Sequence, residues 1–569
     1  MEIKPMIRKI YAGVLVALLV FFSVLPVNGN SFSDEPDQGY EAINIKSLKA
    51  YLNFLAANLL EGREATTRGY DIAAAYAVSL FGQWGLTPIV ETNGEKGFLQ
   101  TFSVLEIASK NNESLQIITN QNDTQITQDF SNRIHFLISR ASNTTSLTAP
   151  IVFAGYGLVV PEIKYDDYAG VDVKNKVVIV MSHAPGEGDE KSYFYKVENR
   201  NRFFNGAEVA EKQRNAQERG ALAVLMVNDP LGKHPSMFTN FATNITRKPT
   251  NNINAPTPRR RMVLAESESS SSNVPIINIS EVVSNAIFKD LDFNLVELQQ
   301  ELNSRLKSVS RNLIGKQVKI NLEVEQKLLN TTNVIGMIEG SDILLKNEYV
   351  VIGAHLDHDG TRDGYIWNGA DDDASGSSAV LELARAFSLA KEKPKRSIIF
   401  CLWGAEEKGL LGSEYFVDHP PVALERISAM IQLDMIGRDV EPRPHQLQGR
   451  EKPKELRRYI YTEIGTQSQE IGEILMQANK TVGLELNHEV NARVSGGSDH
   501  YSFWKKKIPI LSIDDGVFHP DYHQPSDTTE KINFEKIFFV TQLTYLIGRE
   551  VANYPSKIKW DDKITSANR

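Results

Sequence analysis

The chain has 569 residues, of which 41% are hydrophobic, and its formal net charge is −9 at pH 7. A chain of this length can form two or more domains with separate cores. Its acidity and the lack of a large basic patch argue against a nucleic-acid partner, because the arginine run at 259–261 stands in a polar, loop-like stretch. The single cysteine, Cys401, excludes an intramolecular disulfide, and its apolar neighbours indicate a buried strand residue rather than a catalytic thiol.

The N-terminus has the pattern of a signal peptide. Basic residues between positions 4 and 9 precede an apolar run at 11–27, after which the sequence becomes polar. We expect residues 1–29 to be removed, so that the protein is exported, either periplasmic or secreted, without a stable membrane anchor. An uncleaved anchor is the alternative, but Pro26 interrupts the run, which is shorter than the ~20 residues that a spanning helix needs.

Three stretches follow, and we expect residues 30–132 and 314–569 to form one domain that an insert at 133–313 interrupts. Apolar residues recur with helical spacing between positions 43 and 102, which predicts packing helices there. The first of these apolar faces is formed by Leu48, Tyr51, Leu52, Leu55 and Leu59. The insert contains short apolar runs between turns and polar tracts, a pattern typical of a β-rich domain.

The last stretch alternates strands and helices. Short apolar runs at 349–354, 398–403, 430–433 and 508–513 predict buried strands, and residues 375–391 predict a helix. Its apolar face is formed by Val380, Leu383, Ala384 and Phe387. This pattern predicts an α/β fold with a mixed, mostly parallel central sheet flanked by helices, in which ligands gather beyond the carboxyl ends of the strands.

Five possible metal ligands lie in five short polar clusters of this stretch. They are His355, Asp372, Glu407, Asp434 and His523. Two imidazoles and three carboxylates suit a borderline ion such as zinc, and one carboxylate can bridge two ions. A lone histidine after a strand is more often structural, and a lone aspartate before a helix is more often an N-cap. Together the clusters predict a two-metal hydrolytic site.

Two further acids belong to the same clusters. Asp357 lies two residues after His355 and can accept its other imidazole N–H, which would fix the orientation of a metal-bound ring. Glu406 and Glu407 are adjacent, and such a pair repels in a dry pocket unless a cation compensates or one acid is protonated. A metal ligand next to a general base would explain why two glutamates are adjacent here.

Seven sequence runs, in this order, resemble the M28 zinc metallopeptidases, which include bacterial aminopeptidases. The runs are NVIGMIEGSD, VVIGAHLDHDG, NGADDDASG, LWGAEEKGLLGS, LDMIGR, GGSDHYSF and YHQPSDT. The resemblance implies the zinc-peptidase fold and is strong over residues 333–553. The insert, with FAGYGL and GALAVLMVND, is similar to the protease-associated (PA) domain that interrupts many members.

This resemblance implies a role for each residue of the predicted site. Asp372 would bridge two zinc ions, one completed by His355 and Asp434 and the other by Glu407 and His523. Glu406 would be the general base, and Tyr522 would hydrogen-bond the tetrahedral intermediate. The sequence departs from the common pattern at Asp373 and Gln524, where Asn and Thr are frequent. Neither change removes an expected ligand, and Asp373 adds a negative charge near the expected ions, which bears on metal preference.

The activity that the resemblance implies is a zinc-dependent aminopeptidase acting on peptides. Carboxypeptidase or glutaminyl-cyclase-like amide chemistry on the same fold is one alternative. An inactive, receptor-like relative is another, although the five expected ligands and the expected base are all present.

Overall fold

The computed structural model describes residues 38–562, apart from positions 111, 122–123, 133, 141–142, 205, 207, 233–259, 269–273, 363, 443–446 and 448–450. The predicted signal peptide at residues 1–29 lies outside the described residues. Within the described part, no helix combines the length and the apolar character needed to cross a membrane.

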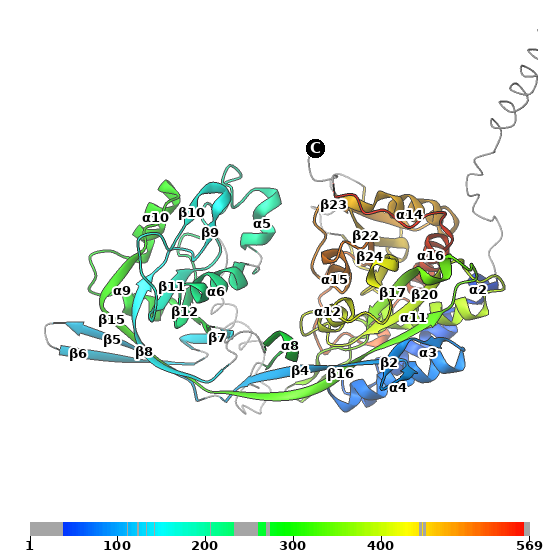
Figure 1. The fold of residues 1–569 in the computed structure, drawn as a ribbon, viewed down its shortest axis with the longest axis horizontal. Coiled ribbons are helices and arrows are strands. Elements are labelled where there is room, and N and C mark those ends of the chain that lie inside the picture. The colour runs from blue at the N-terminus through cyan, green and yellow to red at the C-terminus, as the bar shows by residue number, and fades with distance from the viewer. Residues whose placement is uncertain are drawn as a thin grey trace, which may run out of the picture.

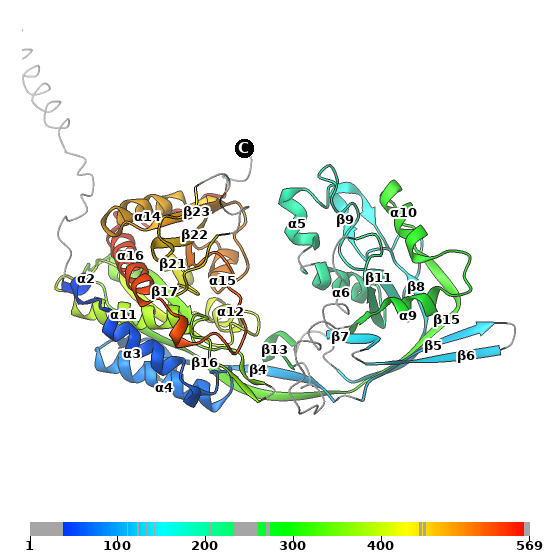
Figure 2. The same ribbon diagram turned by 180° about the vertical axis from the view of Figure 1, so that it is seen from behind.

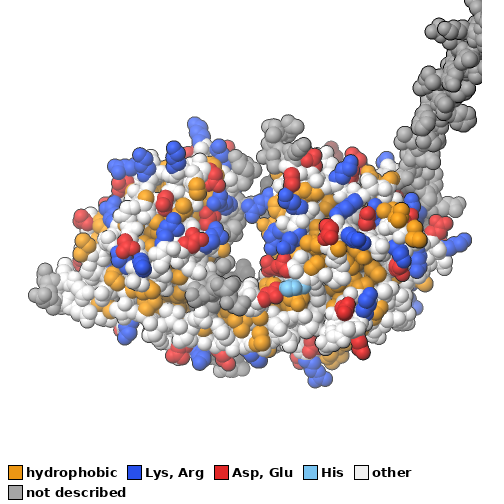
Figure 3. All heavy atoms as spheres, viewed as in Figure 1, with side chains coloured by type: hydrophobic (Ala, Val, Ile, Leu, Met, Phe, Trp, Pro, Cys, Tyr) orange, Lys and Arg blue, Asp and Glu red, His pale blue; other side chains and the backbone are white. Residues whose placement is uncertain are grey.

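Two lobes, each built on a β-sheet, make up the described chain (Figures 1 and 2). The long strands β4 (Leu99–Ser109) and β16 (Val324–Ile338) pair antiparallel and run from one lobe to the other. On the face drawn in Figure 3, basic and acidic side chains are intermingled over both lobes.

The first lobe contains a ten-stranded sheet in the order β13-β4-β16-β20-β17-β21-β24-β22-β23, with β1 paired to β16. The remaining strands of this sheet are β1 (Thr87–Pro88), β13 (Arg260–Leu264), β17 (Tyr349–His355), β20 (Ser397–Trp403), β21 (Ile427–Leu433), β22 (Tyr459–Gly465), β23 (Glu485–Asn491) and β24 (Ile510–Asp514). Strands β20, β17, β21 and β24 are parallel neighbours, so their carboxyl ends meet at one edge.

The α/β fold with a mixed sheet and flanking helices is confirmed, but the sheet is not mostly parallel. Strands β13, β4, β16 and β20 pair antiparallel in succession, as do β24 and β22. The ribbon of β4 and β16 that carries the insert accounts for much of this antiparallel half. Parallel pairing is concentrated in the strands that precede the polar clusters.

Helices cover both faces of this sheet. One face packs against α3 (Ile45–Leu55), α4 (Arg68–Gln83), α11 (Ala374–Leu389), α14 (Gln469–Val482) and α16 (Phe534–Asn553). The other face packs against α12 (Leu411–Asp418) and α15 (His500–Lys505). The predicted helix is α11, and the four residues of its predicted apolar face are buried. Cys401 is buried in β20, as predicted.

The predicted helical pattern between positions 43 and 102 holds only in part. Helices α3 and α4 form, but short strands β2 (Val90–Thr92) and β3 (Glu95–Gly97) and then β4 follow them. Leu59 was expected on the buried face of the first helix, yet it is 72% exposed because α3 ends at Leu55.

The second lobe has its own core and an eight-stranded sheet in the order β6-β5-β15-β8-β11-β12-β14-β7. Its strands are β5 (Ser114–Gln121), β6 (Thr124–Ser131), β7 (Phe136–Arg140), β8 (Thr145–Phe153), β11 (Val177–Met181), β12 (Ala223–Val227), β14 (Ile276–Ile279) and β15 (Arg311–Leu322). Among its helices are α6 (Glu208–Glu218), α9 (Glu281–Phe288) and α10 (Leu295–Arg305). The division of the chain at 133 and 313 stays a prediction, although β5 and β6 precede it.

Candidate metal centre

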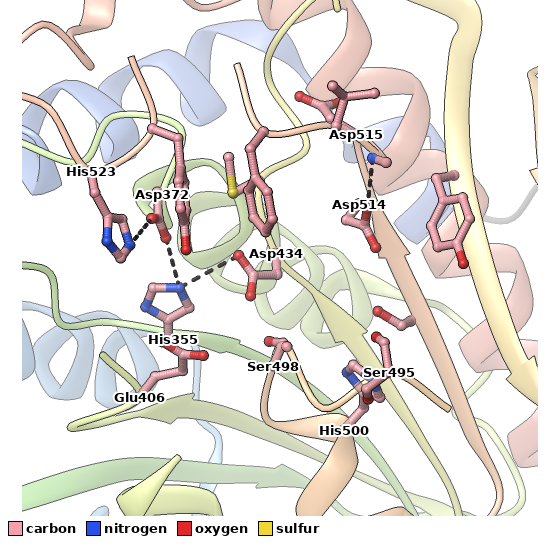
Figure 4. Close-up of a pocket in the computed structure, with 18 of the residues that line it drawn as sticks. His355, Asp372, Glu406, Asp434, Ser495, Ser498, His500, Asp514, Asp515 and His523 are labelled. Atoms are coloured by element: carbon pink, nitrogen blue, oxygen red, sulfur yellow. Dashed lines mark hydrogen bonds and ion pairs between the residues drawn. The ribbon is translucent and has the colours of Figure 1, made fainter. Parts of the chain in front are cut away.

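The polar clusters meet at the edge where the parallel strands end. His355 is the last residue of β17, Glu406 and Glu407 follow β20, and Asp434 follows β21. Because neighbouring parallel strands end at the same edge, segments far apart in the chain deliver these side chains to one place. Figure 4 shows His355, Asp372, Asp434 and His523 gathered around the same cavity.

Asp372 lies in the turn that leads into α11, directly before the N-cap of that helix. Its neighbour Asp373 is the N-cap of that helix and accepts hydrogen bonds from the backbone N–H groups of Gly376, His355 and Met435 at 2.8, 3.2 and 3.1 Å. Burial raises the pKa of Asp373 well above its usual range. The carboxylate that departs from the family pattern therefore holds three segments of the site together.

The first donor group consists of His355, Asp372 and Asp434. His355 Nε2 lies 3.0 Å from Asp372 Oδ1 and 3.5 Å from Asp434 Oδ1. One ligand atom from each residue lies within 4.8 Å of the others, a spacing that could hold a metal ion. These are the three residues that the resemblance assigns to one ion.

The second donor group lies on the other oxygen of Asp372. His523 Nε2 is 3.1 Å from Asp372 Oδ2 and 3.1 Å from Glu407 Oε2, so the two residues expected to complete this group are together. His358 is also present, with Nδ1 2.8 Å from Glu407 Oε1 and 3.8 Å from Asp372 Oδ2. His358 was not expected at this site, although it stands in the same run, GAHLDHDG, as His355.

Several buried atoms of the second group are oriented in a way that fits a cation. His358 Nδ1, Glu407 Oε1 and Asp372 Oδ2 make no hydrogen bond to any described residue, even though they lie close together. Buried polar atoms are normally hydrogen-bonded, so atoms that converge without hydrogen-bond geometry need another partner. Imidazole nitrogens and carboxylate oxygens are ligands that zinc accepts.

Asp357 supports the site through different atoms from those expected. We expected its carboxylate to accept the second N–H of His355, but the acceptor is the main-chain oxygen of Asp357, 3.0 Å from His355 Nδ1. This contact leaves Nε2 directed at Asp372 and Asp434. The Asp357 carboxylate accepts the backbone N–H of Glu406 at 2.9 Å and so positions the turn that carries the two glutamates.

The two adjacent glutamates have opposite electrostatic surroundings. Burial raises the pKa of Glu406 well above its usual range, against the opposing influence of His355. Burial and Asp372 would also raise the pKa of Glu407, but the imidazoles of His358 and His523 hold it at about 2. Two neighbouring acids with pKa values driven apart are typical of sites where one acid is a ligand and the other exchanges protons.

Buried groups behind the ligands fix the loops that present them. Arg63 is 1% exposed and donates to the main-chain oxygens of Leu356, Leu55, Asn368 and Gly369 at 2.9, 2.7, 2.5 and 3.1 Å. This guanidinium joins the segment after β17 to the segment before Asp372.

Asp527, which follows His523 in the run YHQPSDT, gives similar support. Its carboxylate accepts the backbone N–H groups of Asp371 and Asp372 at 3.0 and 3.2 Å. The last sequence cluster therefore supplies a candidate ligand and also positions the carboxylate that both donor groups share.

A cavity of about 330 Å³ opens beside the donor groups. Its lining includes Glu406 and Tyr522, the two residues expected to act on substrate. The Tyr522 ring stacks on His523 with a centroid distance of 3.9 Å, and burial raises its pKa. Both side chains therefore line the same cavity as the candidate ligands His355, Asp372, Asp434 and His523.

Comparison with known proteins agrees with this architecture. Residues 333–545 match Peptidase family M28, and residues 147–286 match the PA domain. Leupeptin-inactivating enzyme 1 from Streptomyces exfoliatus is 32% identical over 32% of this chain and 36% of that protein. Aminopeptidase YwaD from Bacillus subtilis is 26% identical over 70% of this chain and 66% of that protein. The chain thus spans about a third of the length of the first of these relatives.

A solved structure shows the same fold. The aminopeptidase from Aneurinibacillus sp. strain AM-1 superposes with a TM-score of 0.56 at 21% identity, covering 92% of this chain and 97% of that chain. Fold and site define a mixed-sheet α/β protein with a cluster of His, Asp and Glu side chains that could hold metal ions at the ends of its parallel strands. Residues 333–545 of the chain belong to peptidase family M28, and a segment that matches the PA domain, residues 147–286, precedes them.

Proposed function

We propose that this protein is a two-zinc aminopeptidase that removes N-terminal residues from peptides. The observation that carries the proposal is the position of Asp372, whose two oxygens face two different donor groups. A carboxylate that is shared in this way suits a bridging ligand, and the mixed nitrogen and oxygen donors suit zinc. Asp373 does not weaken the choice of zinc, because its carboxylate is held by main-chain amides.

We assign His355 and Asp434 to one ion, and Glu407 and His523 to the other. His358 is an additional candidate ligand, or a neighbour of the ligands, on the Glu407 side. A zinc pair held there would lower the pKa of a water molecule toward neutrality and polarise the scissile carbonyl.

Glu406 and Tyr522 would act on the reacting groups. Glu406 takes the proton from the attacking water and passes it to the leaving amine, a role that needs a carboxylate near the ions but not bound to them. Tyr522 donates its hydroxyl hydrogen to the oxyanion that develops on the carbonyl, and its raised pKa keeps that hydrogen in place at neutral pH.

The choice of the N-terminal end of the peptide is supported by the relatives, because YwaD and the Aneurinibacillus protein are both described as aminopeptidases. A peptide panel tests this choice. We expect zinc-loaded protein to release the first residue from a peptide with a free N-terminus, and to spare the same peptide after N-acetylation. Cleavage of the acetylated peptide from its C-terminus would instead support a carboxypeptidase, and no cleavage of either peptide would contradict both activities.

We also propose that the protein is exported and that residues 133–313 form a separate PA-like insert. Loss of export on deletion of residues 1–29 would support the first proposal. Limited proteolysis would test the second, because cuts near 133 and 313 are expected if the insert folds as its own unit.

A further inference from the structure

The cavity extends from the candidate ligands to a second group of polar residues. Figure 4 shows His355, Asp372 and His523 at one end of this view and Asp514, Ser495 and His500 at the other. Asp514 ends β24, next to the strand that ends before Asp434, so it lies one strand farther along the same edge. The wall of the cavity at this end is therefore built by the sheet itself.

Asp514 is an acid without a cationic partner among the described residues. Its carboxylate accepts the backbone N–H of Gly516 at 2.6 Å, and it takes part in none of the ion pairs that involve the described part of the chain. Its neighbour Asp515 differs, because Lys536 Nζ lies 2.6 Å from its Oδ1. Burial raises the pKa of Asp514 well above its usual range, since a carboxylate there lacks a compensating charge.

A second acid lines the same end of the cavity. Glu489 accepts the hydroxyl hydrogen of Tyr461 at 3.0 Å, and Tyr461 lies directly across the β22–β24 pairing from Asp514. Neither carboxylate is neutralised by a lysine or arginine of the described chain. Burial raises the pKa of Tyr461, and the charges of Glu463, Glu489 and Asp514 raise it further.

His500 adds an acceptor that has no partner. The residue lines the cavity and is 1% exposed. Its Nε2 lies 3.1 Å from the main-chain oxygen of Ser495, so Nε2 carries the hydrogen and Nδ1 is the unprotonated acceptor. Nδ1 makes no hydrogen bond to any described residue. A buried acceptor without a donor is costly, so this end of the cavity is suited to a ligand that donates hydrogen bonds.

We propose that this end of the cavity binds the lysine or arginine side chain of the substrate's N-terminal residue, with Asp514 and Glu489 as the determinants of specificity. The inference rests on the proposed aminopeptidase function. A cationic side chain supplies both the positive charge and the N–H donors that the acids and His500 lack. Phe518 and Val517, which also line the cavity, can contact the aliphatic stem of such a side chain.

The substrate's α-ammonium group is the other cation that could reach these acids. The two possibilities differ in substrate dependence. An acid that binds the side chain affects only basic substrates, whereas an acid that binds the α-ammonium group affects every substrate equally.

The test compares L-lysine p-nitroanilide with L-norleucine p-nitroanilide, which has a side chain of similar length without the charge. We expect the zinc-loaded protein to favour lysine in kcat/KM by about tenfold or more, because a buried, charged site discriminates strongly against a substrate that leaves it unpaired. Asp514→Asn should lower this lysine-to-norleucine ratio at least about tenfold, and Glu489→Gln should also lower it. Asp418→Asn is the matched control, because Asp418 is an acid on α12 that does not line the cavity.

Three results would overturn the inference while leaving the aminopeptidase proposal intact. They are a wild-type preference for norleucine, an unchanged ratio in Asp514→Asn, and an equal loss of both substrates in that variant. If Asp514→Asn does not fold, the wild-type preference and the ratio in Glu489→Gln decide the matter. If neither substrate is cleaved by the wild type, the proposed function itself fails.

Discussion

Replacing Glu406 by glutamine tests the central step of the proposed chemistry. The side chain lines the cavity, its backbone N–H is fixed by the Asp357 carboxylate at 2.9 Å, and it belongs to neither donor group. Glutamine keeps the volume of the side chain and removes only its capacity to take a proton. The ligands and the turn that carries them should therefore remain in place.

The expected size of the effect follows from what a general base contributes. Positioned proton transfer accelerates reactions by about 10²–10⁴-fold, so kcat should fall by that factor, equivalent to about 3–5 kcal/mol in the activation free energy. KM should change little, because the substrate contacts remain. Zinc content should stay near that of the wild type.

Glu407→Gln is the matched variant, because it makes the same substitution one residue away. Glu407 lies 2.8 Å from His358 Nδ1 and 3.1 Å from His523 Nε2, within the second donor group. A neutral amide oxygen is a weaker ligand than a carboxylate, so this variant should lose zinc as well as activity.

Zinc stoichiometry by elemental analysis and kcat on an aminoacyl p-nitroanilide, measured for both variants, distinguish the two roles. If Glu406→Gln loses zinc while Glu407→Gln keeps it, the roles are reversed. Full activity with full zinc in both variants would refute this site.

Four further predictions concern the ligands and the framework. After dialysis, Asp372→Ala should have lost both zinc ions, and His523→Ala should have lost mainly one. A chelator should abolish the activity of the wild type, and added zinc should restore it; activity that persists in excess chelator would contradict a metal site. His358→Ala should weaken zinc binding on the Glu407 side by about 10–100-fold, measured by competition with a chromogenic chelator, and unchanged affinity would make this histidine a packing residue. Arg63→Met should lower the free energy of unfolding by about 3 kcal/mol or more, because four buried carbonyl oxygens lose their donor, and a smaller change in denaturant unfolding would show that water replaces the guanidinium. Burial raises the pKa of Asp167 from 3.8 to about 7. The free energy of unfolding of the second lobe should therefore fall as the pH rises between those values, and Asp167→Asn should remove that part of the pH dependence of thermal unfolding.

Sequence patterns alone predicted the strands and the polar residues that follow them. Runs of consecutive apolar residues identified β17, β20, β21 and β24, because strands buried on both faces need apolar side chains at every position. Parallel strands that end at one edge then explained why His355, Glu407 and Asp434 should meet. The spacing of apolar residues was a poorer guide to where the first helix ends. Leu59 follows the helical spacing but lies beyond the end of α3 and is exposed.

Only the tertiary structure decided which side chains belong to the site and how they are oriented. His358 follows the pattern of an ordinary polar residue near a strand end, and its approach to Glu407 depends on how two loops pack. The same holds for Asp357, whose main-chain oxygen rather than carboxylate contacts His355, and for Asp373, which binds main-chain amides from three segments.

Specificity depends still more on the three-dimensional arrangement. Asp514, Glu489 and His500 come from two strands and a helix, and nothing in their separate sequence surroundings relates them. The spacing of apolar residues in a sequence indicates which side chains of one helix or strand are buried, but not which other segment they contact. Some acids meet a lysine, as Asp515 does, and others have no lysine or arginine partner among the described residues, as is true of Asp514. Which of these occurs depends on contacts between distant segments that the fold alone creates.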